Sequence, residues 1–181
     1  MNQNKPIILL DPYPRTMDLL FSKQNLNYLK KNFKLIIAPN KNKKNFYEKN
    51  LPKADYIFGQ PNLPSSLISK SKKLKAIFNV ESNFMDNMDY DYCFRKGIHV
   101  LATSPVFAQP VAEMAMGLTL SIARSIHIAH SDFISKKEKY GGAISQNNFL
   151  LKNKTFGLIG FGDLAKSLTP ILKAFSNKII A

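Results

Sequence analysis

Short apolar runs alternate with longer polar segments along the first hundred residues. Five runs have the length of a strand, at residues 6–10, 33–38, 56–58, 74–80 and 98–101. The segments between them place apolar residues at helical spacing, which predicts helices over 18–31, 67–72 and 90–96. Runs that are apolar throughout are typical of strands buried on both faces of a parallel sheet. The pattern therefore predicts a flavodoxin-like, doubly wound α/β unit.

The pattern changes after residue 104. A long helical segment follows Ser104-Pro105, and it has one face made of Val111, Ala115, Leu118 and Ile122. It is too long for a simple crossover, so we expect it to link two domains. Residues 135–148 are polar and predict a loop, and a strand, turn, helix and second strand follow at 156–159, 160–163, 164–175 and 178–181. The expected domains are 1–104 and 105–181.

A glycine-rich turn lies between the strand and the helix of the second domain. Gly160-Phe161-Gly162-Asp163-Leu164-Ala165 matches the pattern G-x-G-x-x-[G/A] in the strand-to-helix context that gives this pattern its meaning. Gly160 permits the tight turn, Gly162 lets a pyrophosphate approach the backbone, and Ala165 allows close packing of the helix. Free N–H groups at the helix start would then hold the phosphates. We predict a dinucleotide site at these six residues, against the alternative of an ordinary glycine-rich turn.

Two features of the sequence leave the role of Asp163 and the choice between NAD and NADP undetermined. A carboxylate at Asp163 is unfavourable beside a pyrophosphate unless it turns to solvent or interacts with the helix N-terminus. The acidic residue that reads the ribose hydroxyls is expected about 20 residues past the turn, and the sequence stops at Ala181, inside the second strand. The expected cofactor is therefore NAD or NADP.

The formal net charge of +14 comes from 26 Lys and Arg against 12 Asp and Glu. The lysine clusters at 40–45 and 70–73 contain no aromatic residues between the charges, so we interpret them as solvated helix faces and loops rather than a nucleic-acid patch. The positive field also favours an anionic cofactor or substrate. We expect no nucleic-acid partner.

The location is predicted from the cysteine count and from the hydropathy. Cys93 is the only cysteine, as in a reducing compartment, and we expect it to be a buried thiol in a cytoplasmic protein. The chain starts with no signal-peptide pattern. Polar residues such as Gln109, Glu113 and Arg124 interrupt the apolar stretch at 106–128, so we expect no membrane span.

Several segments resemble one known family, the D-isomer-specific 2-hydroxyacid dehydrogenases. Residues 153–162, NKTFGLIGFG, resemble the family's "GKTVGIIGFG" at the start of its cofactor domain. Residues 110–113 and 123–124 resemble its "VAE…LALAR" helix, and residues 86–89 with 96–100 resemble its "DNVD…RGIPV" segment. The resemblance is specific from about residue 74 onward. It implies a flavodoxin-like substrate domain followed by the start of a Rossmann NAD(P)-binding domain.

The resemblance also implies an activity and its site. Family members transfer a hydride reversibly between nicotinamide and a 2-oxo acid, such as hydroxypyruvate, glyoxylate or a phosphoglycerate-type acid. The catalytic Arg, acidic residue and His belong to the later cofactor domain, so we expect no catalytic residue before Ala181 and a chain that is a catalytically silent fragment. His99, His127 and His130 do not match the catalytic His, and no metal site is expected. Family members are usually dimers, so a homodimer is expected for the full-length protein.

The family's substrate loop, "AGVGVD", matches Glu81-Ser82-Asn83-Phe84-Met85-Asp86. The resemblance makes Ser82, Asn83 and Phe84 substrate-binding candidates, and Asn83 also a contact to the nicotinamide end of the cofactor. Ser82 and Phe84 replace both loop glycines, which puts the loop conformation and the substrate size in doubt. This departure favours a second hypothesis, a non-enzymatic NAD-binding regulator of the same fold.

A third hypothesis is a phospho-receiver-like domain. Asp11 ends the first strand, as the acidic pocket of such a domain requires. The third strand ends in Gly59-Gln60, where that pocket would need an Asp to accept the phosphate. The sequence therefore disfavours this hypothesis.

Overall fold

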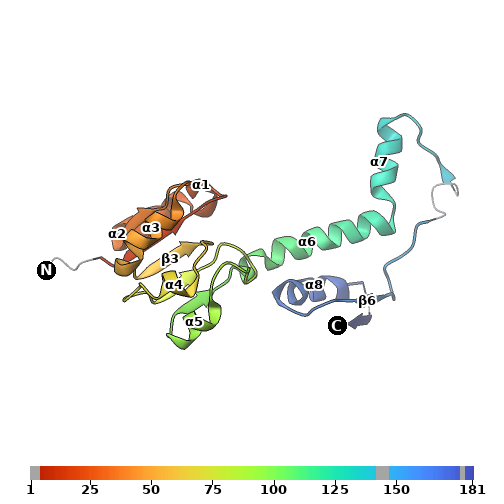
Figure 1. The fold of residues 1–181 in the computed structure, drawn as a ribbon. Coiled ribbons are helices and arrows are strands. Elements are labelled where there is room, and N and C mark those ends of the chain that lie inside the picture. Colours follow the sequence, from red (N-terminus) through yellow and green to blue (C-terminus); the bar gives the residue numbers. More distant parts are fainter. Residues whose placement is uncertain (1–4, 142–146, 176–177) are drawn as a thin grey trace. The chain divides into compact units, whose positions relative to one another are not determined.

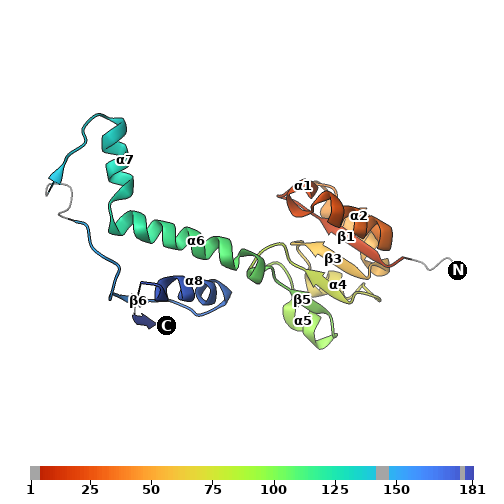
Figure 2. The same ribbon diagram turned by 180° about the vertical axis from the view of Figure 1, so that it is seen from behind.

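The computed structural model describes residues 5–141, 147–175 and 178–181. Within it the chain divides into two compact units, Met1–Thr103 and Ser104–Ala181 (Figures 1 and 2). This division lies next to the boundary expected from the sequence. Each unit has its own sheet and its own core.

The first unit is built on a five-stranded parallel sheet. Its strands lie in the order β2-β1-β3-β4-β5. In chain order they are β1 (Ile7–Asp11), β2 (Lys34–Ile37), β3 (Tyr56–Gly59), β4 (Ala76–Phe78) and β5 (His99–Leu101). In the register, Leu9 of the central strand pairs with Ile36 on one side and Ile57 on the other. This strand order is that of flavodoxin-like folds, so the predicted fold class is confirmed.

Helices cover both faces of this sheet. They are α1 (Met17–Leu20), α2 (Lys23–Asn32), α3 (Lys43–Asn50), α4 (Ser65–Ile68) and α5 (Tyr90–Arg95), with a 3₁₀ turn, η1, at Leu51–Lys53. The single helix expected over 18–31 is wrong, because the chain is extended at Phe21 and Ser22. Ser22 caps α2 by accepting a hydrogen bond from the Asn25 N–H at 3.2 Å.

Two other helices differ from the sequence prediction. The helix expected at 67–72 is α4, which starts after Pro64 and ends at Ile68. No bounds were predicted for a helix beside the lysine cluster at 40–45, which we interpreted as solvated helix faces and loops, and the structure has α3 there with Tyr47 buried. Lysines outnumber apolar residues there, so helical periodicity was too weak to detect.

The core of the first unit lies between the sheet and its helices. Leu9, Ile57 and Ile77 from neighbouring strands are fully buried there with Tyr47 and Cys93. Each buried Leu or Ile side chain stabilises the fold by about 1.5–3 kcal/mol. Cys93 is thus the buried helical thiol that the sequence predicted.

We expect the Cys93 thiol to be almost inert in the folded protein. It has no exposed surface, and burial raises its pKa, so little of the reactive thiolate is present at neutral pH. Reaction with Ellman's reagent at pH 7 should be roughly 100-fold slower in buffer than in 8 M urea. Equal rates in the two solvents would contradict this burial.

The second unit holds a long helix, a two-stranded parallel sheet and the helix that connects its strands. Its elements are α6 (Ser104–Ala123), α7 (Ile126–Ile134), β6 (Thr155–Gly157), α8 (Asp163–Lys173) and β7 (Lys178–Ile180). Helix α6 packs on α8, and Met116 and Ala123 of α6 share a buried cluster with Leu151 and Leu172. The predicted loop at 135–148 includes residues 142–146, which lie outside the described residues.

The long apolar segment forms two helices rather than one. Ser125 has a positive φ of 52° and separates α6 from α7. His127 and His130 therefore lie on α7. A residue in the left-handed region ends a helix because it turns the backbone away from the helical path.

Helix α6 is buried along one face only. Ala108, Ala112 and Met116 are buried, whereas Leu118 and Ile122 of the predicted apolar face are 57% and 63% exposed. Its length and apolar composition would also suit a membrane span. That is weak support for a span, because helices of soluble cores share these properties.

Candidate functional site

The glycine turn forms a sharp bend between β6 and α8. The strand ends at Gly157, two residues before the end expected from the sequence, and α8 begins at Asp163. Gly160 has a φ of +89°, in the left-handed region that favours glycine. The backbone of the turn therefore reverses into the helix instead of continuing either element.

The backbone of the turn is open on the side that a ligand would approach. A Cβ atom added at Gly160 or Gly162 would meet no atom within 4 Å. Gly162 is the N-cap of α8 and has no side chain to cap it, and the first N–H groups of a helix lack intrahelical acceptors. The Lys166 N–H donates to the Gly162 carbonyl at 3.0 Å. The amides before Lys166 can therefore hold an anion, so the residues present fit a pyrophosphate.

An apolar cavity of about 160 Å³ adjoins this turn. Its walls come from α6, the turn and α8, and the lining residues are Val111, Ala112, Ala115, Leu158, Ile159, Gly160, Leu164, Ala165 and Leu168. Phe161 and Leu164 are 49% and 39% exposed, so neither is packed into the core. Asp163 is half-buried in the first turn of α8, where a carboxylate interacts favourably with the helix dipole.

The predicted substrate loop lies in the first unit, between β4 and α5. Ser82 is half-buried, and Asn83 and Phe84 are exposed. The Phe84 ring stacks on the Tyr90 ring of α5, with centroids 4.8 Å apart and planes 24° apart. The side chain that replaces a family glycine thus anchors the loop to α5. These three residues and the glycine turn belong to different units.

A polar network that was not predicted from the sequence connects this loop to the segment after β3 and to α5. The Asn87 Nδ2 donates to the Pro61 carbonyl at 2.6 Å, and its Oδ1 lies 3.2 Å from Gln60 Nε2 and 3.0 Å from Tyr90 Oη. The Glu81 N–H reaches Gln60 Oε1 at 3.4 Å. Gln60 directly follows β3, and its place at the carboxyl end of a strand was the signal that could have identified it.

Replacing Asn87 with alanine should loosen the substrate loop. The change leaves the Pro61 carbonyl and the Gln60 amide without their partners, which costs about 1–3 kcal/mol. Hydrogen exchange of residues 81–89 should become faster in the variant. Asn83→Ala is the matched control, since Asn83 is exposed and its loss should change stability by less than about 0.5 kcal/mol. Unchanged exchange in the Asn87 variant would contradict the role of the network.

An ion pair ties the same loop to the segment after β1. The Arg15 guanidinium contacts the Glu81 carboxylate, and the pKa of Arg15 is raised by this hydrogen bond. Both side chains are about one-third exposed. Such a partly solvated pair contributes up to about 1 kcal/mol. The ion pair therefore restrains mainly the start of the substrate loop, at Glu81.

The carboxyl end of β1 holds a buried carboxylate. Asp11 accepts from the Lys43 ammonium at 2.7 Å and from the Tyr47 hydroxyl at 3.1 Å. Burial, and then the Asp11 charge, raise the pKa of Tyr47, so this phenol stays protonated. A Cβ at Gly59 would lie 2.5 Å from the Asp11 carbonyl oxygen, which explains the glycine at the end of β3.

This arrangement gives no support to the receiver-like hypothesis. The Asp11 carboxylate is engaged by Lys43 and Tyr47. Among the described residues, no group of three or more His, Cys, Asp or Glu side chains is placed to bind a metal ion. Asp11 is therefore best explained as a structural residue of the sheet edge.

Known proteins match this chain across both units. Residues 15–178 match the family model of the D-isomer specific 2-hydroxyacid dehydrogenase catalytic domain. Hydroxypyruvate reductase of Thermotoga maritima is 39% identical over 117 residues, which cover 65% of this chain and 37% of that protein. Glyoxylate reductase of Thermococcus litoralis is 33% identical over 118 residues, covering 63% and 35%.

A solved structure agrees with these sequence relatives. A phosphoglycerate oxidoreductase from Rhizobium etli superimposes with a TM-score of 0.76 at 36% identity, over 97% of this chain and 54% of that one. The chain thus spans about half the length of this structure, and its matches cover little more than a third of the two reductases.

Proposed function

Because the chain belongs to the family of D-isomer specific 2-hydroxyacid dehydrogenases, we propose that it forms the substrate-binding and first cofactor-binding parts of an NAD(P)-dependent oxidoreductase. The reaction is hydride transfer between nicotinamide and a 2-oxo acid or its D-2-hydroxy form. Candidate acids are hydroxypyruvate, glyoxylate and phosphoglycerate-type compounds. The observation that carries the proposal is the open glycine turn at Gly160 and Gly162.

The turn would bind the pyrophosphate of the cofactor. The amides of residues 160–165 and the positive end of α8 supply hydrogen bonds and partial charge without a charged side chain. The apolar cavity beside Ala165 offers a surface for uncharged parts of the same ligand. Bound NAD(P) supplies the hydride acceptor or donor. The chain's own contribution is therefore to bind and orient the cofactor.

The loop containing Ser82, Asn83 and Phe84 would bind the organic acid. Backbone N–H groups of an ordered loop are suitable donors to a carboxylate. The Phe84–Tyr90 stack and the Asn87 network hold the loop in one conformation, which lowers the entropy lost on binding. Asn83 is exposed and is proposed to contact the acid and the nicotinamide end of the cofactor.

Dinucleotide binding and turnover test this function separately. Titration calorimetry of the 181-residue chain with NADH and with NADPH should give binding to at least one of them, with no NADH oxidation in the presence of hydroxypyruvate or glyoxylate. The protein extended to the length of its relatives should oxidise NADH with one of these acids. Binding without turnover in that longer protein would favour the NAD-binding regulator. Absence of binding in both forms would reject the proposed cofactor site.

We also propose that a second copy of the chain covers the exposed face of α6. Met114, Leu118 and Ile122 follow one another at helical spacing and are 57–64% exposed. Apolar patches of this kind mark interaction sites. A cytoplasmic homodimer agrees with the organisation usual in the family.

A charge on this face should weaken the dimer. Leu118→Asp places a carboxylate at the centre of the proposed interface, and we expect a dissociation constant raised by roughly thirtyfold, the effect of a hot-spot residue. Sedimentation equilibrium measures it. Leu19→Asp is the control, because Leu19 is 76% exposed on α1 in the other unit. A monomer in the parent protein, or an equal loss in both variants, would reject the interface.

A further inference from the structure

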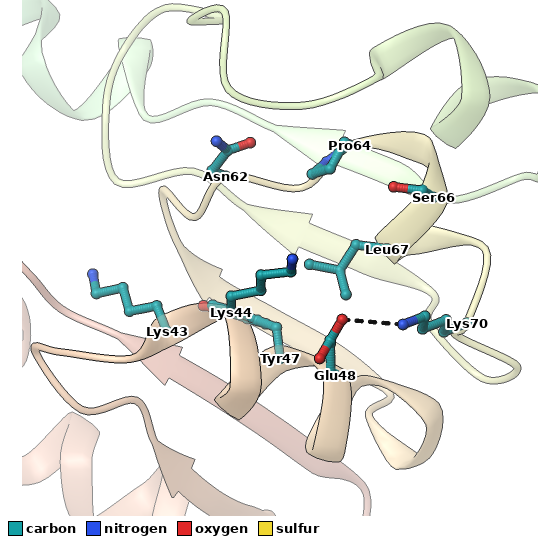
Figure 3. Close-up of a pocket in the computed structure, with 9 residues that line it drawn as sticks. All are labelled: Lys43, Lys44, Tyr47, Glu48, Asn62, Pro64, Ser66, Leu67 and Lys70. Atoms are coloured by element: carbon teal, nitrogen blue, oxygen red, sulfur yellow. Dashed lines mark hydrogen bonds and ion pairs between the residues drawn. The ribbon is translucent and has the colours of Figure 1, made fainter.

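A second cavity lies in the first unit, apart from the glycine turn. It has a volume of about 460 Å³ and opens between α3 and the segment that follows β3 (Figure 3). Its lining residues are Lys43, Lys44, Tyr47, Glu48, Asn62, Pro64, Ser66, Leu67 and Lys70. Ligand sites of proteins have volumes of about 300–1,000 Å³, so this cavity is large enough for a small metabolite.

The cavity is lined by an excess of positive charge. Lys43 is paired with Asp11, and Lys70 is bridged to Glu48 at 3.2 Å. Figure 3 shows the Lys44 side chain extending from α3 towards the opposite wall, with its ammonium near Leu67, while Lys43 points away. Within the described part of the chain, the Lys44 ammonium forms no ion pair or hydrogen bond. This ammonium can therefore pair with an anion from solution.

The opposite wall adds neutral hydrogen-bond donors. Asn62 and Ser66 follow β3 and lie across the cavity from Lys44, and Pro64 and Leu67 between them supply apolar surface (Figure 3). An amide, a hydroxyl and an ammonium that line one cavity from two sides can each donate to a phosphate, whose oxygens accept several hydrogen bonds. The apolar patch suits a short carbon chain.

We propose that this cavity binds a small organic anion with a phosphate group. Lys44 is its charged partner, and Asn62 and Ser66 donate hydrogen bonds to the phosphate oxygens. The site does not depend on the proposed function, since it shares no residue with the glycine turn or with the Ser82–Phe84 loop.

A short series of hydrogen bonds connects this cavity to the chain next to the substrate loop. Leu63, next to Asn62, donates its N–H to the Asn87 carbonyl at 2.7 Å and forms a bridge with Met88. The Asn87 amide donates in turn to the Pro61 carbonyl at 2.6 Å. An anion bound to Asn62 would therefore also restrain the neighbouring contacts of Leu63 and Asn87.

Amide chemical shifts measured during a phosphate titration test the proposal. Inorganic phosphate added to the ¹⁵N-labelled chain should shift the amides of Lys44, Asn62 and Ser66 in a saturable way. Lys44→Gln should weaken this binding by roughly five- to tenfold, the effect of one exposed charge-assisted hydrogen bond. Lys49→Gln is the matched control, because Lys49 is an exposed lysine of α3 that does not line the cavity.

The remaining outcomes separate this site from other anion binding. Shifts confined to residues 160–165 would place the phosphate at the glycine turn and overturn the proposal while supporting cofactor binding. Equal weakening in the Lys44 and Lys49 variants would show only a general effect of net charge and would also overturn it. Saturable shifts with succinate but not with phosphate would reject the phosphate group and identify the cavity as a carboxylate site.

Discussion

Replacing Gly162 with alanine should remove most of the affinity for a dinucleotide while the protein stays folded. Gly162 has a φ of −83° and a ψ of −161°, which an alanine adopts without strain. Its added methyl group would meet no atom of the protein within 4 Å. The methyl would instead occupy the space in which a pyrophosphate approaches the N–H groups of α8. Loss of one or two charge-assisted hydrogen bonds corresponds to roughly 10–100-fold weaker binding.

Titration calorimetry with the dinucleotide measures the affinity, and thermal unfolding measures the stability of the variant. Gly117→Ala is the matched control: Gly117 lies in α6, its added Cβ also meets no atom within 4 Å, and alanine favours a helix by about 1 kcal/mol. Gly160→Ala should lower both affinity and stability, because Gly160 has a φ of +89°. Unchanged affinity in the Gly162 variant would remove the glycine turn from the proposed site.

Replacing Lys43 with methionine should destabilise the first unit by about 2–4 kcal/mol. The Asp11 side chain is only 2% exposed, so its carboxylate would stay buried with the Tyr47 hydroxyl as its remaining partner. An unpaired buried charge costs several kcal/mol. Lys43 is 29% exposed, so solvent reaches part of the pair and we expect a loss at the lower end of the range for fully buried pairs.

Urea unfolding followed by tyrosine fluorescence measures this loss. The chain contains no tryptophan and 7 tyrosines, and all but Tyr140 precede residue 104. Lys70→Met is the matched control, because it breaks the exposed Lys70–Glu48 pair and should cost less than about 1 kcal/mol. If both variants lost the same small free energy, the Asp11 carboxylate would not need Lys43.

The candidate sites of both units lie where parallel strands end. Asp11 ends β1, Gln60 follows β3, the Ser82–Phe84 loop follows β4, and the glycine turn follows β6. In α/β sheets, ligands bind outside the carboxyl ends of the strands, because the loops there start side by side and the helices that follow direct their N-termini to the same edge. Cofactor and acid would thus be bound by the same kind of sheet edge in two units.

The sequence by itself determined the strands of the first unit and the glycine turn of the second. Buried parallel strands are apolar throughout, so 6–10 and 56–58 stood out without knowledge of their neighbours. The turn depends on residues within six positions of one another, and its conformation follows from the absence of a side chain at Gly160. Such local features are determined by residues that are close together in the sequence.

Only the tertiary structure decided which apolar face is covered and which charges meet. Helix α6 is apolar on several faces, so periodicity could not show that Ala112 and Met116 are buried while Leu118 is exposed. Asp11 and Lys43 lie 32 positions apart, and the cavity beside Lys44 is closed by residues from 62 onward. The physical reason is that burial and pairing depend on which elements pack together, and a local pattern of residues does not contain that information.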